Sequence, residues 1–251
     1  GQAEKALDIC RETKVKARND RNHPALIRAA ITEARLLRQT LPFLPLDTLF
    51  APVEQEITLA SPPLKGILQA AYAGALEKIY FAERVRLLAQ SEIGAPTLAF
   101  HAQQNPPANP LHNSHSELAA THRKISSLYQ AATANPKVYK GLTAGRYRAV
   151  LEADKNLIPF QPLLIDVIAF RAATFWQAEF PNLVKEKAFL TRYKTDFFDP
   201  YAKFAYKKFE SADTNLHAYR LAQLFKELFV LHLADAKPFP IVAADLLRLR
   251  T

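Results

Sequence analysis

One apolar segment constrains the fold more than any other, because its pattern is that of a helix buried on nearly all sides. It runs from Gln161 to Trp176, and Pro162 occupies a first-turn position, where its fixed φ and missing amide hydrogen cost nothing. Its apolar residues recur at steps of three and four and cover most of the helix circumference: Leu164, Ile165, Val167, Ile168, Ala169, Ala172, Phe175 and Trp176. Such a helix packs among other helices. We therefore expect it to be the central helix of an all-helical domain.

The same period of 3.6 residues recurs along most of the chain, and no segment shows the alternation of a strand. The 17 prolines and only 6 glycines agree with this pattern, because strand-and-turn folds need glycine at turns with positive φ. We predict an all-α protein with at least eight helices. Apolar stripes place helices over 3–18, 47–60, 64–90, 215–235 and 242–249, with others beginning at Pro24 and near Ser116.

These helices are expected to form a single domain over residues 1–251, as an irregular array of helical hairpins around the buried central helix. The first two helices, joined by the short polar turn 19–23, are typical of a tetratricopeptide-like antiparallel pair. No strict repeat follows them, so the array is solenoid-like without a fixed period. Residues 93–115 are rich in proline, asparagine and histidine and predict a long exposed loop. Any subdivision of the domain should fall near this loop.

The chain contains no motif of a familiar catalytic chemistry. It lacks a phosphate-cradling glycine loop, a nucleophile-elbow serine, a zinc-type histidine pair and a dinucleotide fingerprint. One group could resemble a metal cluster: His112 and His115, with Glu117 and His122 nearby. Its first members lie in the proline-rich loop, which does not hold ligands rigidly enough for zinc. We therefore predict no metal, no cofactor and no catalytic residue, so that the chain is not an enzyme.

Three further residues carry reactive or charged groups in apolar surroundings. Cys10, the single cysteine, lies on the apolar side of the first helix and is expected to be a small buried hydrophobe, not a reactive thiol. Asp166 and Arg171 lie in or near the buried helix, and five residues apart they cannot pair on its surface. Because an unpaired buried charge is costly, each should meet a polar group on a neighbouring helix.

The net charge of +9 permits binding to nucleic acid or anionic lipid without requiring it. Lysines interleave with aromatic residues in one run: Phe189, Tyr193, Phe197, Phe198, Tyr201, Phe204, Tyr206 and Phe209. Such a run could stack the bases of a single strand, but its helical spacing favours packing in a core, with solvated lysine ends. The other basic residues are spread over every helix, so we expect no nucleic-acid partner. No apolar run approaches the roughly 20 residues that span a bilayer, which leaves membrane attachment to an anchor outside this chain.

Together these segments resemble the N-terminal helical region of the very large bacterial alpha-2-macroglobulin-like proteins. The central segment is similar to the proline-started motif of that region, with Asp166, Arg171 and Ala172 in register. The likeness covers most of the chain, departs from the family over 93–115, and is carried by three places: 6–9 with 16–18 and 24–31, then 162–175, then 231–235 with 244–249.

The resemblance implies a non-catalytic accessory or interaction domain from the N-terminal part of a much longer, protease-trapping protein of the bacterial cell envelope or periplasm. Its partners would be downstream domains of the same polypeptide or another envelope protein. Many family members carry a thioester built from a cysteine and a glutamine. Cys10 is followed by Arg-Glu instead of the required Gly-Glu-Gln, so trapping chemistry is expected downstream. Two alternatives stay open: a free-standing helical-repeat adaptor that binds peptides or proteins in a concave groove, and a basic nucleic-acid-binding module.

Overall fold

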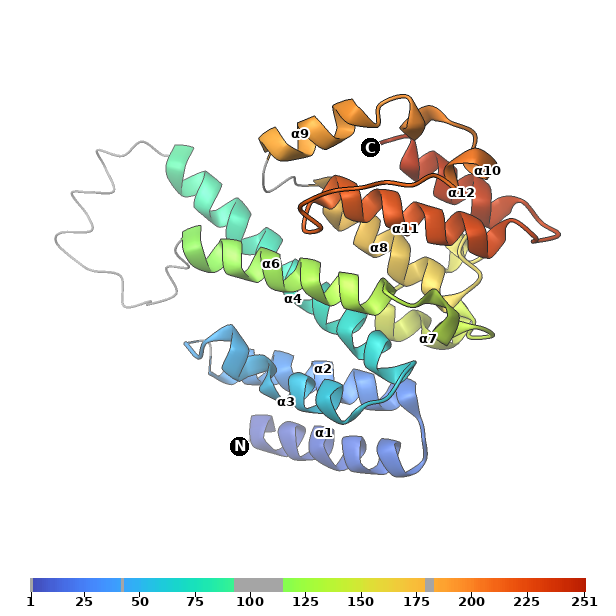
Figure 1. Cartoon of the computed structure of the whole chain (residues 1–251). Coiled ribbons are helices and arrows are strands. Elements are labelled where there is room, and N and C mark those ends of the chain that lie inside the picture. Colours follow the sequence, from blue (N-terminus) through green and yellow to red (C-terminus); the bar gives the residue numbers. More distant parts are fainter. Residues whose placement is uncertain (1, 42, 93–114, 179–182) are drawn as a thin grey trace. The chain divides into compact units, whose positions relative to one another are not determined.

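The computed structural model describes residues 2–41, 43–92, 115–178 and 183–251 (Figure 1). Within these ranges the protein is 76% helical, with 11 α-helices, and its strand-like content is one isolated bridge between Thr143 and Leu163. The all-α prediction is therefore confirmed, whereas the predicted loop lies, over 93–114, outside the described residues. The contacts divide the chain into two compact units, Gly1–Leu128 and Tyr129–Thr251.

The first unit begins with the predicted helical hairpin. Helix α2 packs between α1 and α3, and α4 packs against both α2 and α3. The turn into α2 follows from its sequence, because the Asn22 side chain accepts a hydrogen bond from the Ala25 amide while Pro24 occupies the first turn. The elements are α1 (Gln2–Asn19), α2 (His23–Thr40), α3 (Leu46–Leu59), α4 (Leu64–Glu92) and α6 (His115–Thr133), whose last turn belongs to the second unit.

A buried charged cluster ties the first three helices together. Lys14 Nζ lies 2.6 Å from Glu33 Oε2 and 3.9 Å from Glu56 Oε1, and Arg18 bonds Glu56 at 2.7 Å. Buried carboxylates require such partners, so the cluster fixes how α1, α2 and α3 meet. Beside it, Cys10 is buried as predicted; burial raises the pKa of its thiol, and the nearby Glu33 raises it further.

The second unit is built around α8 (Leu164–Ala178), which buries ten of its 15 residues. It packs against α7, α11 and α12 (Figure 1). The helix predicted to be central is therefore the central helix of this unit. Around it lie η1 (Pro136–Tyr139), α7 (Ala144–Leu151), η2 (Lys155–Leu157), α9 (Leu183–Arg192), η3 (Asp196–Phe198), α10 (Tyr201–Phe204), α11 (His217–His232) and α12 (Phe239–Arg248).

The aromatic run forms a packed cluster in this unit, as its spacing predicted. The Phe189 ring lies 4.8 Å from that of Tyr193, and the Phe204 ring lies 5.0 Å from that of Phe209. Five members of the run are buried: Phe189, Tyr193, Phe197, Phe204 and Phe209. Three are exposed: Phe198, Tyr201 and Tyr206.

The helical spacing of the run holds only in its first part, because α10 ends at Phe204 and Phe209 lies in irregular backbone. An earlier break separates η3 from α10 at Pro200, the N-cap residue of α10, which has no amide hydrogen with which to continue the preceding helix. The buried Arg248 donates hydrogen bonds to the carbonyl oxygens of Phe197 and Asp199, each at 2.8 Å. These carbonyl groups are thereby satisfied without a helix.

Candidate functional site

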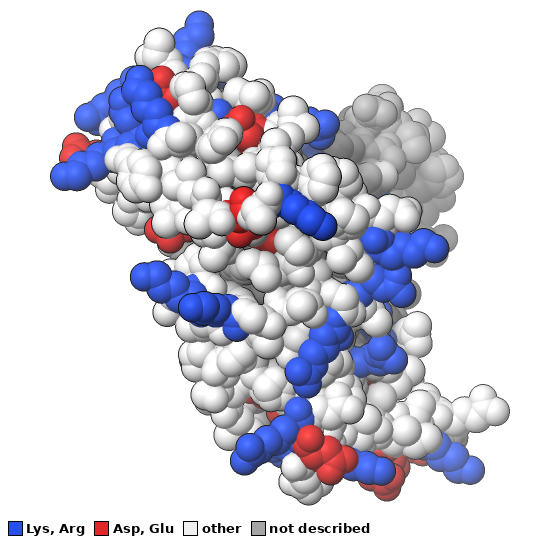
Figure 2. Space-filling view, turned by 90° about the vertical axis from the view of Figure 1, so that its right-hand side faces the viewer, with Lys and Arg blue, Asp and Glu red and all other residues white. Residues whose placement is uncertain are grey.

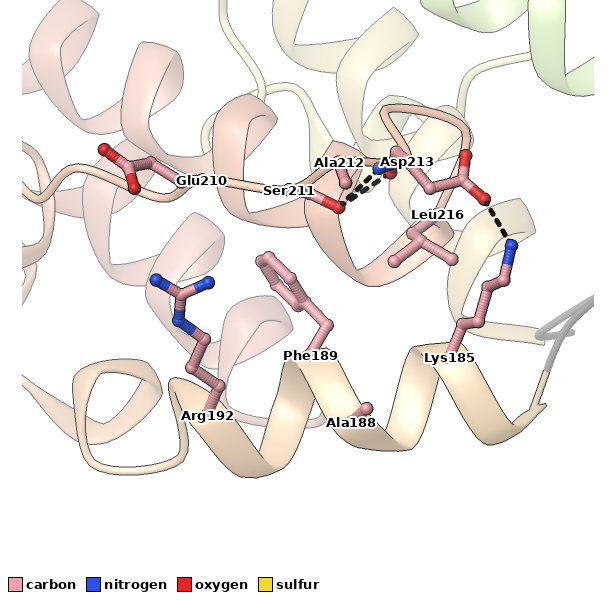
Figure 3. A pocket seen from close by; sticks show the side chains of 9 residues that line it. All are labelled: Lys185, Ala188, Phe189, Arg192, Glu210, Ser211, Ala212, Asp213 and Leu216. Carbon is pink, nitrogen blue, oxygen red and sulfur yellow. Dashed lines mark hydrogen bonds and ion pairs between the residues drawn. The ribbon is translucent and has the colours of Figure 1, made fainter.

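Helix α9 and the segment 210–216 enclose an open groove of about 520 Å³ in the second unit (Figure 3). Phe189 projects from α9 towards the opposite wall, where Leu216 and Ala212 lie. Ala188, Phe189, Ala212 and Leu216 form the apolar floor of the groove, and charged side chains lie at both of its ends. The lining residues are Lys185, Ala188, Phe189, Arg192, Glu210, Ser211, Ala212, Asp213 and Leu216.

Two contacts beside the apolar residues, one buried and one part-buried, join the two walls of the groove. The Glu186 carboxylate accepts hydrogen bonds from the amides of His217 and Ala218, at 2.7 and 2.9 Å, and so fastens α9 to the N-terminus of α11. Burial raises the pKa of Glu186, although these two bonds act in the opposite direction. At the other end, the Tyr193 hydroxyl accepts from the Glu210 amide at 3.0 Å and donates to the Glu210 carbonyl at 3.3 Å.

The ends of the groove carry charges of both signs. Lys185 Nζ lies 3.3 Å from the Asp213 carboxylate, which also accepts from the Asn215 amide. That backbone bond, followed by the lysine, lowers the pKa of Asp213. At the opposite end the guanidinium of Arg192 lies 5.1 Å from the centre of the Tyr193 ring. An apolar floor with polar groups at its ends suits the side chain and flanking residues of a bound polypeptide.

The groove offers no activated nucleophile. Its one hydroxyl belongs to Ser211, which donates to the Asp213 carbonyl at 2.8 Å and accepts from the Asp213 amide at 3.2 Å. A serine acts as a nucleophile when a neighbouring base removes its proton, and these partners are backbone groups. The Ser211 hydroxyl is thus held by the backbone of its own segment.

A second polar constellation, Asp166 with His232 and Asp235, resembles a catalytic carboxylate–histidine pair. His232 Nε2 lies 2.8 Å from Asp166 Oδ1, and His232 Nδ1 lies 2.6 Å from Asp235 Oδ2. The other Asp166 oxygen accepts from the Leu163 amide at 2.9 Å. Burial alone lowers the pKa of His232, but the bonds and charges of the two carboxylates outweigh it and raise that pKa.

This constellation joins α8, α11 and the turn after α11 around a buried histidine. The His232 side chain is 1% exposed and that of Asp166 is 2% exposed, and both ring nitrogens of the histidine are engaged by carboxylates. The prediction that Asp166 meets a polar group on a neighbouring helix is confirmed, with α11 as that helix. Arg171 is half-buried, and its guanidinium lies 4.0 Å from the carboxylate of Glu152, the residue after α7.

Of the three histidines in the group that could resemble a metal cluster (His112, His115 and His122), the structure describes the side chain of His122. His122 is buried in α6, where its ring lies 5.4 Å from that of Tyr80. His112 lies outside the described residues. Among the residues that the structure describes, no group of three or more His, Cys, Asp or Glu side chains is placed to hold a metal ion.

The sequence analysis did not predict the burial of Arg248. A basic residue in the last turn of a helix is ordinarily a solvated partner of the helix dipole, yet its side chain is 1% exposed. Its guanidinium lies 4.6 Å from the centre of the Phe204 ring and bonds the Asp245 carboxylate at 2.6 Å. Its position between Leu247 and Leu249 was the one available signal of burial.

On the face shown in Figure 2, Lys and Arg side chains form separate groups divided by uncharged and acidic residues. No helix in the described ranges is both long and apolar enough to cross a membrane. Comparisons with protein-family models, with curated proteins and with solved structures found no match.

Proposed function

We propose that this chain is a non-catalytic helical interaction domain that docks a polypeptide segment in the groove between α9 and residues 210–216. The groove itself carries the proposal: an apolar floor between walls held by Glu186 and Tyr193, with charged groups at both ends. A bound segment would place an apolar side chain between Phe189 and Leu216 and its polar neighbours beside Lys185 and Arg192.

We further propose that the domain belongs to the N-terminal region of a large envelope alpha-2-macroglobulin-like protein. The contacts of the segments that carry the resemblance support this proposal. Asp166 in the central segment bonds His232 in the closing one, and Arg248 anchors the last segment to the aromatic cluster. Two of the three places that carry the resemblance, 162–175 and 231–249, therefore contact each other in the second unit, whereas the first place lies in the first unit. Downstream domains of the same polypeptide, or another envelope protein, would supply the docked segment.

A free-standing helical adaptor would use the same groove, so the two proposals differ in what surrounds the chain. The complete reading frame discriminates between them. A signal peptide before this region and a series of β-sandwich domains after it would support the envelope protein. A frame that encodes this helical region alone would support the adaptor.

The docking proposal is tested by panning a peptide library against the intact chain and comparing two variants. Ala188→Trp fills the groove from an exposed position, whereas Val184→Trp changes an exposed residue of the same helix that does not line the groove. Selected peptides should bind the parent chain and Val184→Trp alike and lose about tenfold or more in affinity for Ala188→Trp, because the apolar floor is occupied. Peptides that bind all three proteins equally would show that the groove is not the docking site.

A further inference from the structure

The outward side of α12 is a continuous apolar stripe. Phe239 is 48% exposed, Val242 47%, Leu246 58% and Leu249, directly after the helix, 45%. Their spacing of three, four and three residues is the seam of a coiled-coil helix. The opposite side of the same helix is already buried in the unit through Pro240, Ile241, Ala244 and Arg248. Helix α12 is therefore apolar on two sides, and only one of them is covered within the described residues.

Two aromatic residues extend this stripe at its ends. The ring of Phe160, 42% exposed, lies 5.9 Å from that of Phe239. Phe198, 67% exposed, lines a small hollow together with Leu249. Single exposed apolar residues are ordinary, but a contiguous row of large ones marks an interaction site. We call the row Phe160, Phe239, Val242, Leu246, Leu249 and Phe198 the α12 seam.

The charges beside the α12 seam are positive. Lys237 precedes Phe239 by two residues, Arg250 follows Leu249, and Lys194 lines the hollow that Leu249 shares with Phe198. All three are exposed, and none lies within ion-pair distance of a carboxylate in the described part of the chain. The acids of the same region are engaged elsewhere, Asp235 by His232 and Asp245 by Arg248.

We propose that the α12 seam binds an amphipathic helix that has an apolar seam of its own and acidic side chains at both ends. The three-four-three spacing selects a helix, because knobs on one seam fit the holes of another. The cations at the two ends select acidic flanks. The same cations disfavour a second copy of this chain as the partner. An antiparallel pair would bring Lys237 of one copy close to Arg250 of the other, and a parallel pair would bring each cation close to its own counterpart. An anionic bilayer matches the charge but favours a broader apolar face than one helical seam.

This surface is distinct from the groove of the preceding proposal, because the two share no lining residue. A chain whose groove is filled by Ala188→Trp should therefore still bind at the α12 seam. The two proposals can accordingly fail separately.

The test uses a labelled synthetic peptide of three heptads with leucine at a and d and glutamate at e and g, and its matched counterpart with lysine at e and g. Fluorescence anisotropy at physiological salt reports binding of each to the intact chain. The acidic peptide should bind at least about tenfold more tightly than the basic one. Leu246→Lys should weaken its binding by about tenfold or more, whereas Val184→Lys, an exposed control outside the seam, should change it by less than about twofold.

Reversal of the flanking charges provides the decisive comparison. In the double variant Lys237→Glu, Arg250→Glu the preference should shift towards the basic peptide. The proposal is overturned if neither peptide binds, if both bind equally, or if Leu246→Lys has no effect. It is also overturned if Leu246→Lys abolishes self-association in sedimentation velocity, or cosedimentation with phosphatidylserine vesicles, while the acidic peptide does not bind. Those results identify a second copy or a lipid surface as the occupant.

Discussion

At the scale of single residues, the most informative group is the histidine of α11 held between two carboxylates. His232 is buried, and both of its ring nitrogens bond acids, one from α8 and one from the turn after α11. Arg248 is comparable, since its buried guanidinium bonds two carbonyl groups and one carboxylate. In a sequence such residues resemble catalytic groups. Their hydrogen-bond partners in the structure indicate that they stabilise the fold.

The raised pKa of His232 makes a testable contribution to stability. Its protonated form stabilises the folded chain fully below its ordinary pKa of about 6.5, and that contribution is lost as pH rises through the higher folded value. We therefore expect Asp166→Asn to cost about 3 kcal/mol at about pH 5.5 and less at about pH 8.5. Urea unfolding followed by fluorescence of Trp176, the single tryptophan and a buried residue of α8, measures this unit directly.

The exposed Glu227 on α11 provides the control, because Glu227→Gln keeps the buried constellation intact. Its unfolding free energy should follow that of the parent chain at every pH. Parallel curves for the parent and Asp166→Asn would contradict the assignment of this pH dependence to His232.

At the scale of elements, α8 should be the helix least tolerant of a polar substitution. Ile168 is 0% exposed, so Ile168→Asp would bury a carboxylate without a partner, at a cost of about 3–5 kcal/mol. Thr174→Asp places the same side chain on the exposed side of the same helix and should have a small effect. Thermal unfolding of both variants decides the matter. If Ile168→Asp melts within a few degrees of the parent, α8 does not organise the second unit.

The elements also show what a sequence can and cannot predict here. Periodicity located α1, α3, α4, α8 and α11 within a few residues, because one buried face leaves a repeating signal. Periodicity could not identify His232, 66 residues away, as the partner of Asp166, because a hydrogen bond between distant residues produces no repeating pattern in the sequence. The groove was equally hidden, since one of its walls is the irregular segment 210–216.

At the scale of the whole molecule, the described residues form two compact helical units that use their polar residues in similar ways. Lys14, Glu33 and Glu56 fix the helices of the first, and Asp166 with His232 and Arg248 fix those of the second. The exposed groove and the exposed α12 seam are two surface features of the second unit that these internal contacts do not use. We interpret both as surfaces for other polypeptides.

The central claim is that this chain works by binding and not by capturing a protease. The most direct measurement is to incubate the intact chain with a panel of proteases, assay their residual activity and separate the mixtures on denaturing gels. We predict full protease activity and no denaturant-resistant adduct, because the one cysteine is buried in α1 without the thioester sequence. Stoichiometric inhibition, or a shifted protease band that survives denaturation, would contradict the claim and place trapping chemistry in this chain.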